Sequence, residues 1–380
     1  MSNKGIFFCL FLIFSFFTLS AQHKVTFIVS SLPAYHNSTE NLYLAGSFNG
    51  WDPGNDQYKL KSSSGHPGIS IDLPSGTYEF KITKGSWDKV ECGNNAFPLE
   101  NRKISVSKDT VIDITIEHWS DHFPKQEKVH TAGKNVHIID TAFYIPQLNR
   151  SRRIWIYLPH SYNTSRKKYP VLYMHDGQNV FDEATSGFGE WGVDEALDTL
   201  QNRFPEMIVV AIDNDPVHRI NEYAPYDMVK YGKAEGDAYV DFLVKTLRPF
   251  INKHYRTRKC GRHNYIAGSS MGGLISFYAM LKYPGKFGGA GVFSPAFWIN
   301  PQLKAIDPKK AKKIKGKIYY FAGQQESDSM VPDMLSVFEQ MHKHSKVKME
   351  TVIRAQGKHN EATWRAEFPA FYAWLTGKKL

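Results

Sequence analysis

The sequence has little cysteine: three residues among 380. Cys9 lies in an apolar N-terminal stretch, whereas Cys92 and Cys260 fall in segments that we assign below to different domains. A structural disulfide is therefore not expected. No group of Cys and His residues has the spacing of a zinc site, and we expect neither a metal ion nor a cofactor.

Long apolar runs are also lacking, except at the N-terminus. Lys4 supplies a short positive region, residues 5–19 are apolar, and Ser20-Ala21 offers small residues for cleavage. This order is typical of a signal peptide, residues 1–21, and the apolar part is short for a membrane span. We expect a secreted or periplasmic protein without an integral membrane span after cleavage. A retained membrane anchor is the alternative.

Acidic residues are the minority charge, with 37 Asp and Glu against 47 Lys and Arg. The resulting formal charge of +10 is spread thinly, with basic clusters at residues 166–168 and 309–317. Neither cluster has the helical or aromatic interleaving of a nucleic-acid surface, so no nucleic-acid partner is expected. A solvated face explains the clusters, and attraction to acidic polysaccharide or a cell envelope is the alternative.

Residues 22–118 alternate short apolar runs with turn signals such as Asn49-Gly50 and Pro53-Gly54. Short strands at this spacing predict a small immunoglobulin-like β-sandwich. Residues 119–135 are polar, contain Pro124 and lack periodicity, so we interpret them as a linker. We expect strands at residues 25–29, 42–45, 69–73, 78–82, 103–106 and 111–116.

Residues 136–380 follow a different pattern, in which apolar β-rich runs alternate with helix-like stretches. This alternation predicts an α/β domain with a mostly parallel sheet and helices on both faces. We expect strands at residues 154–158, 171–174, 207–212, 265–267, 318–322 and 347–353, and helices at 193–200, 236–251 and 274–283.

The strongest chemical signal is the segment Gly268-Ser269-Ser270-Met271-Gly272, which matches the pattern G-x-S-x-G. An apolar strand leads into it and an apolar helix follows, which is the setting of the nucleophile in an α/β-hydrolase. Side chains at Gly268 and Gly272 would clash in so sharp a turn. Ser270 is therefore the candidate nucleophile.

A serine hydroxyl needs a base, which in this fold follows a late strand. His359 has that place, in a loop after the strand at 347–353. The acid that orients it should follow an earlier strand, and both Glu326 and Asp328 do so. We favour Glu326, with Asp328 as the second choice.

An acyl-transfer transition state also needs hydrogen-bond donors for its oxyanion. The backbone N–H of Met271 is one candidate and that of Gln178, in a loop after an early strand, is the other. Trp298 and Trp191 are candidate walls of the substrate pocket, and Arg219 is a candidate anchor for a carboxylate. Core packing explains each of these three residues equally well.

Four ordered segments resemble the esterase-D-like family of α/β-hydrolases, which includes feruloyl, acetyl-xylan and siderophore esterases and mycolyltransferases. The resemblance covers roughly residues 130–380 and implies Ser270 as nucleophile, His359 as base, and Met271 with Gln178 as oxyanion hole. Asp176-Gly177-Gln178 is more similar to the siderophore-esterase and mycolyltransferase members than to many feruloyl esterases. The four segments are residues 176–181, 191–196, 268–273 and 357–364.

The N-terminal domain resembles starch- and glycogen-binding modules, on residues 42–53, Tyr78 to Ile82 and Trp87. The resemblance implies sugar binding on the faces of Trp51 and Trp87. A packing role for Trp51 and a docking role for the whole domain are the alternatives.

Three functions follow as hypotheses. The first is a secreted serine esterase that removes acetyl or hydroxycinnamoyl groups from polysaccharide or oligosaccharide. The second is an esterase for a siderophore-like or other small-molecule ester. The third is a non-catalytic, sugar-binding surface protein with a vestigial hydrolase domain.

Overall fold

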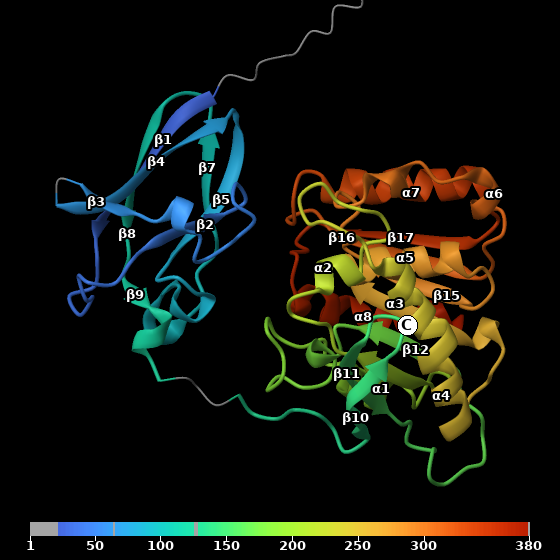
Figure 1. Cartoon of the computed structure of the whole chain (residues 1–380). Coiled ribbons are helices and arrows are strands. Elements are labelled where there is room, and N and C mark those ends of the chain that lie inside the picture. The colour runs from blue at the N-terminus through green and yellow to red at the C-terminus, as the bar shows by residue number, and fades with distance from the viewer. Residues whose placement is uncertain (1–21, 64, 125–127, 379–380) are drawn as a thin grey trace, which may run out of the picture. The chain divides into compact units, whose positions relative to one another are not determined.

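A computed structural model describes residues 22–63, 65–124 and 128–378, so the expected signal peptide lies outside the described residues. The chain divides into two compact units, residues 1–126 and 127–380 (Figure 1). Among the helices that the structure describes, none has both the length and the apolar character needed to cross a bilayer.

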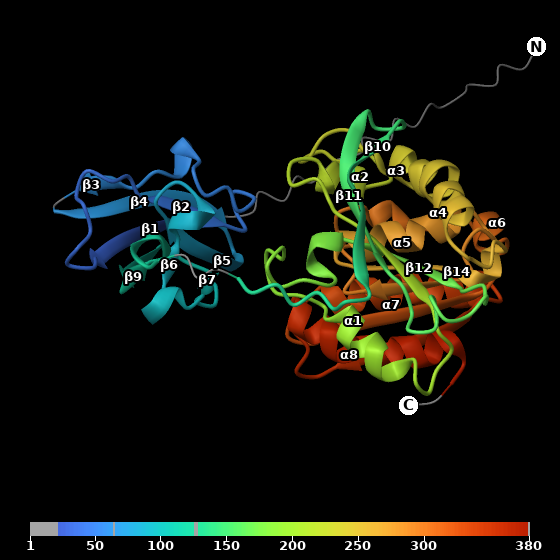
Figure 2. The same ribbon diagram turned by 90° about the horizontal axis from the view of Figure 1, so that it is seen from below.

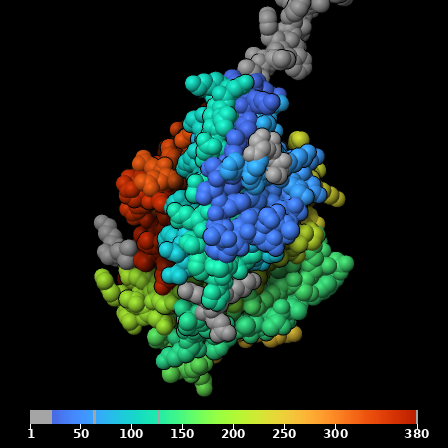
Figure 3. All heavy atoms as spheres, turned by 90° about the vertical axis from the view of Figure 1, so that its left-hand side faces the viewer, coloured from blue at the N-terminus to red at the C-terminus, as the bar shows by residue number. Residues whose placement is uncertain are grey.

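The N-terminal unit consists mainly of two sheets in which most neighbouring strands are antiparallel. Their strand orders are β3-β4-β1-β8 and β2-β5-β7. Phe27 from the first sheet and Phe80 from the second have ring centroids 5.0 Å apart in an edge-to-face arrangement. Buried side chains of both sheets form one apolar cluster, so this unit is a β-sandwich. Its immunoglobulin-like character stays a prediction. In the space-filling view its atoms, blue to teal, form a closely packed surface (Figure 3).

The strands of this unit are β1 (Gln22–Ser31), β2 (Tyr43–Gly46), β3 (Lys61–Ser63), β4 (His66–Pro74), β5 (Gly76–Thr83), β6 (Glu91–Cys92), β7 (Arg102–Val106), β8 (Thr110–Thr115) and β9 (His118–Trp119).

The segment 119–135, predicted as a linker, is structured at both of its ends. Trp119 is completely buried in the core of the N-terminal unit. In the C-terminal unit, the N–H of Thr131 donates to Asp182 at 3.1 Å and that of Gly133 to Asp194 at 2.7 Å. Each end of the segment therefore belongs to one of the two units. The sequence pattern did not indicate this, because a lone tryptophan and buried carboxylates produce no periodic signal.

The C-terminal unit is built on an eight-stranded sheet of order β10-β11-β13-β12-β14-β15-β16-β17. All neighbours from β13 to β17 pair in parallel, and β10 and β11 are antiparallel additions at one edge. This sheet confirms the predicted α/β class. Strand β10 was not predicted, because it is an edge strand with mostly exposed or half-buried residues.

The strands are β10 (Val136–Ile145), β11 (Arg150–Tyr157), β12 (Val171–His175), β13 (Ile208–Ile212), β14 (Asn264–Ser269), β15 (Gly289–Phe293), β16 (Lys317–Gly323) and β17 (Lys348–Arg354). The helices are α1 (Val193–Leu200), α2 (Arg219–Glu222), α3 (Gly236–Phe242), α4 (Arg248–His254), α5 (Met271–Lys282), α6 (Pro308–Ala311), α7 (Met330–His344) and α8 (Glu361–Thr376).

Helices cover both faces of this sheet. Helices α1 and α8 pack on one face, and α3, α4, α5 and α7 pack on the other. Figure 2 shows α8 below the strands and α3, α4 and α5 above them. Successive strand residues alternate between the two cores, as in β13, where Val209 and Ala211 face α1 and α8. The helix predicted at 236–251 is present as a continuous helical run over residues 236–254, formed by α3, a π-helical turn at residues 243–247, and α4.

Candidate active site

The predicted site residues gather where parallel strands end. Asp176, Ser270 and Ser294 each follow the last residue of a strand, β12, β14 and β15 respectively, and each has a positive φ, of 57°, 57° and 42°. A positive φ is uncommon outside glycine and is costly for a residue with a side chain. Glu326 and His359 follow the next two strands, β16 and β17. Since these strands are neighbours in the sheet, their carboxyl ends form one edge.

Ser270 occupies the turn between β14 and α5 with φ 57° and ψ −121°. Its N–H donates to the carbonyl of Phe293 at 2.9 Å, and its own carbonyl accepts from the N–H of Ala296 at 3.1 Å. These bonds hold the strained backbone against β15 and the loop after it. The Ser270 residue is only half-buried, so its hydroxyl can be reached.

Glycine is needed before this turn because the backbone approaches itself closely. A Cβ at Gly268 would lie 2.9 Å from the carbonyl carbon of Gly272 and 3.0 Å from Cδ2 of His175. His175 is buried below the turn, with Nδ1 2.9 Å from the hydroxyl oxygen of Tyr239. Burial lowers the pKa of His175 to about 4, so the ring is neutral at physiological pH.

The backbone N–H groups predicted as oxyanion donors lie in a short 3-10 turn and in the first turn of a helix. Gln178 is the middle residue of a 3-10 turn after β12, and Met271 is the first residue of α5. Within the described part of the chain, neither backbone N–H donates to a protein acceptor. Both are therefore available to an oxygen atom of a ligand.

Arg219 pairs with the loop that carries Gln178. Its Nε and Nη2 donate to the two oxygens of Asp176 at 2.7 and 2.8 Å. Burial raises the pKa of Asp176, but the charge and hydrogen bonds of Arg219 outweigh it and hold that pKa below its usual value. Asp176 thus engages Nε and Nη2 of the guanidinium, and the role of Arg219 as an anchor for a substrate carboxylate stays a prediction.

Glu326 and His359 form a directly bonded pair. His359 Nδ1 lies 2.7 Å from Glu326 Oε2, with the carboxylate side chain 1% exposed and the imidazole 38% exposed. The carboxylate fixes the proton on Nδ1 and leaves Nε2 as the basic nitrogen. Asp328, the second choice for the acid, is exposed on the surface.

Ser294 and Gly323, which were not predicted as site residues, donate hydrogen bonds to Glu326. Ser294 Oγ donates to Glu326 Oε1 at 2.7 Å and accepts from Trp364 Nε1 at 2.8 Å. The N–H of Gly323 also donates to Oε1, at 2.6 Å. The ring of Trp364 packs edge-on against that of His359, with centroids 5.1 Å apart. Trp364 is the last residue of segment 357–364, one of the four that resemble the esterase family. This resemblance was the sequence signal that could have identified Trp364 as a site residue.

The two predicted pocket walls differ in the structure. Trp191 is only 4% exposed and stacks on Trp364 with ring centroids 5.8 Å apart, so it packs in the core, and its role as a pocket wall stays a prediction. Trp298 is 52% exposed, two residues after Ala296, whose N–H bonds Ser270. Trp298 thus remains a candidate for contact with a ligand.

A further buried carboxyl group lies beside the oxyanion loop. Glu361, the first residue of α8, is 6% exposed and accepts from Asn179 Nδ2 at 3.1 Å. Burial raises the pKa of Glu361 to about 7, and the nearby charge of Asp176 acts in the same direction. Glu361 belongs to the segment 357–364, but its burial cannot be read from its residue type.

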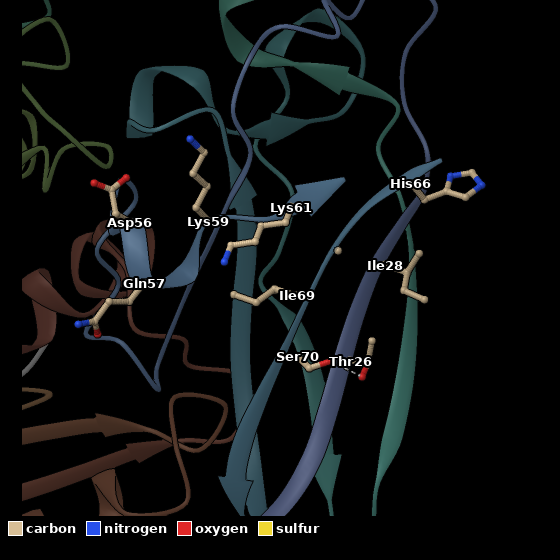
Figure 4. Close-up of a pocket in the computed structure, with 10 residues that line it drawn as sticks. Thr26, Ile28, Asp56, Gln57, Lys59, Lys61, His66, Ile69 and Ser70 are labelled. Atoms are coloured by element: carbon tan, nitrogen blue, oxygen red, sulfur yellow. Dashed lines mark hydrogen bonds between the residues drawn. The ribbon is translucent and has the colours of Figure 1, made fainter. Parts of the chain in front are cut away.

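The predicted sugar-binding tryptophans lie together in the N-terminal unit. Their ring centroids are 6.2 Å apart with the planes tilted by 41°, and Trp87 is 43% exposed. Neither lines the cavity of about 640 Å³ in the same unit, where the hydroxyls of Thr26 and Ser70 are 2.8 Å apart (Figure 4). That cavity is lined by Thr26, Ile28, Asp56, Gln57, Lys59, Lys61, His66, Gly68, Ile69 and Ser70.

Comparison with known proteins adds to this geometry. The model of a family described as "Putative esterase" matches residues 145–375. The uncharacterized protein YbbA of Bacillus subtilis (strain 168) is 26% identical over 245 residues, which cover 60% of this chain and 94% of that protein. An endo-1,4-beta-xylanase/feruloyl esterase of Xylanibacter ruminicola is 24% identical over 237 residues, 60% of this chain and 30% of that protein.

Among solved structures, the enterobactin esterase FES of Shigella flexneri matches with a TM-score of 0.53 at 16% identity. The match covers 93% of this chain and 92% of that chain. At this identity the likeness shows the fold.

The buried carboxyl of Glu361 gives a prediction for stability. Its folded pKa lies above the ordinary value of 4.5, so the native state binds a proton that the unfolded state has lost between about pH 4.5 and 7. Native stability therefore falls as pH rises through that window. Glu361→Gln stays neutral, so its stability relative to the parent protein should rise by roughly 3 kcal/mol between pH 4.5 and 8.

Urea unfolding of both proteins at several pH values measures this difference. The exposed Glu339 on α7 supplies the control, because Glu339→Gln makes the same chemical change without removing a buried carboxyl group. A pH-independent difference between Glu361→Gln and the parent protein would contradict the assignment.

Proposed function

Because the chain belongs to the esterase family whose model matches residues 145–375, and is a carboxylic ester hydrolase, we propose that it is a serine esterase with Ser270 as nucleophile. The observation that carries this mechanism is the hydrogen bond of 2.7 Å between His359 Nδ1 and the buried carboxylate of Glu326. It leaves Nε2 of a half-exposed imidazole as a base at the edge of the sheet where Ser270 follows β14.

In the acylation step, Ser270 Oγ attacks the ester carbonyl carbon while His359 Nε2 takes the hydroxyl proton. The carbonyl oxygen becomes an oxyanion, which the N–H groups of Met271 and Gln178 stabilise. The tetrahedral intermediate then expels the alcohol, which receives the proton from His359. The acyl group remains bonded to Ser270.

Deacylation repeats these steps with water. His359 removes a proton from the water as its oxygen attacks the acyl carbon, and the proton passes to Ser270 Oγ as the carboxylic acid leaves. Glu326 keeps its hydrogen bond to Nδ1 and stabilises the imidazolium that forms in each half of the reaction. Ser294 and Trp364 position that carboxylate without touching the substrate.

The acid assignment gives a matched pair of variants. Glu326→Gln should lower kcat on a small ester by about 10²- to 10⁴-fold, because the imidazole loses its orientation and its counter-charge. Asp328→Asn should leave kcat unchanged, because that carboxylate is exposed and the imidazole is already paired with Glu326. Steady-state kinetics on p-nitrophenyl acetate measures both. Equal activity of Glu326→Gln and the parent protein would show that the acid is dispensable.

We propose further that the substrate is an acyl ester on carbohydrate and that the enzyme is exported. The exposed Trp87 beside Trp51, in a β-sandwich ahead of the catalytic unit, supports sugar binding. The feruloyl esterase among the relatives supports an acyl group of the hydroxycinnamoyl kind. The sequence of residues 1–21 supports export.

A siderophore-like ester is the second candidate. It is supported by the loop Asp176-Gly177-Gln178 and by an enterobactin esterase that matches over both units of this chain. The two candidates differ in the alcohol and in the shape of the acyl group.

A substrate panel separates these candidates. We expect ferulate or acetate to be released from acylated xylan with a kcat/KM at least tenfold above that for a tri-catecholate lactone, since discrimination is set by this ratio. Ser270→Ala should abolish release, whereas Ser336→Ala on α7 should not. Faster hydrolysis of the lactone would replace the carbohydrate proposal with the siderophore one.

A further inference from the structure

Phe188 is an exposed aromatic side chain on a firmly anchored loop. It is 84% exposed and lies between Gly187 and Gly189, the latter with φ +97°. Leaving so large an apolar side chain in water forgoes burial worth roughly 1.5–3 kcal/mol. An isolated exposed apolar residue needs no explanation, but its place in the fold gives this one a role.

The loop that carries Phe188 is bonded to the oxyanion loop on both sides of that residue. Before it, Thr185 Oγ1 donates to the carbonyl of Gln178 at 2.7 Å and the N–H of Gly187 donates to Asn179 Oδ1 at 3.2 Å. After it, the N–H of Trp191 donates to the carbonyl of Asn179 at 2.8 Å. Phe188 is therefore held next to the donor that we assign to the oxyanion.

The same loop also approaches the base. A Cβ at Gly189 would lie 3.7 Å from Cβ of Glu361, which is two residues after His359. The loop that carries Phe188 therefore contacts the loop after β12 and the start of α8. Both segments belong to the edge of the sheet where the reaction takes place.

Trp298 lies in the loop after the strand on the other side of the nucleophile's strand. The nucleophile's strand β14 lies between β12 and β15 in the sheet. Trp298 follows β15, and its loop is fixed to the nucleophile by the bond of 3.1 Å from the N–H of Ala296 to the carbonyl of Ser270. Its neighbour Phe297 is completely buried, which anchors the loop while the Trp298 ring stays 52% exposed.

We propose that Phe188 and Trp298 bind the flat ring of an aromatic acyl group, of the hydroxycinnamoyl or hydroxybenzoyl kind, on its way to Ser270. This inference rests on the proposed function and deepens it by assigning the side chains that select an aromatic acyl group. Aromatic faces stack on flat rings and gain more than the burial of area alone. A short aliphatic acyl group such as acetyl gains nothing from either side chain.

The test compares two methyl esters with the same leaving alcohol, methyl ferulate and methyl butyrate. The parent protein should prefer methyl ferulate in kcat/KM. Phe188→Ala and Trp298→Ala should each lower kcat/KM for methyl ferulate by about tenfold, as expected for one aromatic contact, and change that for methyl butyrate less than twofold. Phe188→Tyr should keep the preference, and Phe188→Leu should lose most of it.

Phe97 provides the matched control, because it is 69% exposed in the N-terminal unit and Phe97→Ala removes the same side chain. That variant should behave as the parent protein does. Equal losses on both esters, or no loss on either, would overturn the inference while leaving the esterase function standing. Failure of the parent protein to hydrolyse any ester would instead overturn the proposed function.

Discussion

The site depends on one strained turn. Ser270 has a φ of 57° that its side chain disfavours, at a cost of about 1–3 kcal/mol, and the surrounding backbone supplies the compensation. Its N–H and carbonyl are both used, by Phe293 and Ala296, in bonds to β15 and its following loop. Phe293 and Ala296 belong to the same segment as Ser294 and Trp298. The two bonds therefore hold the nucleophile in a fixed position relative to this segment.

Burial of one carboxylate explains the other half of the arrangement. The side chain of Glu326 is 1% exposed, and ionised carboxylates are buried only when they are well bonded. Ser294, Gly323 and His359 provide three bonds, and Trp364 holds Ser294 from behind. The imidazole therefore has a fixed tautomer while remaining half-exposed, so that it can exchange protons with a substrate and with water.

Much of this could be predicted from the sequence, because the relevant constraints are local. A strand, a turn with glycine and a helix adjoin Ser270 directly, and His359 follows the last strand. Contacts between residues far apart in the sequence leave no comparable local pattern. Trp191 and Arg219 carry side chains suited to ligands, yet the fold uses them against Trp364 and Asp176. Ser294 and Phe188 acquire their places only when distant loops meet, and no periodicity reports that.

We propose that Ser270 is the residue that becomes acylated during the reaction. The most direct measurement is intact-protein mass spectrometry after reaction with a fluorophosphonate, followed by mapping of the modified peptide. We expect one adduct, on Ser270, that forms much more slowly when His359 is replaced by alanine, because the base is then missing. An adduct on another serine, or equal labelling without His359, would contradict it.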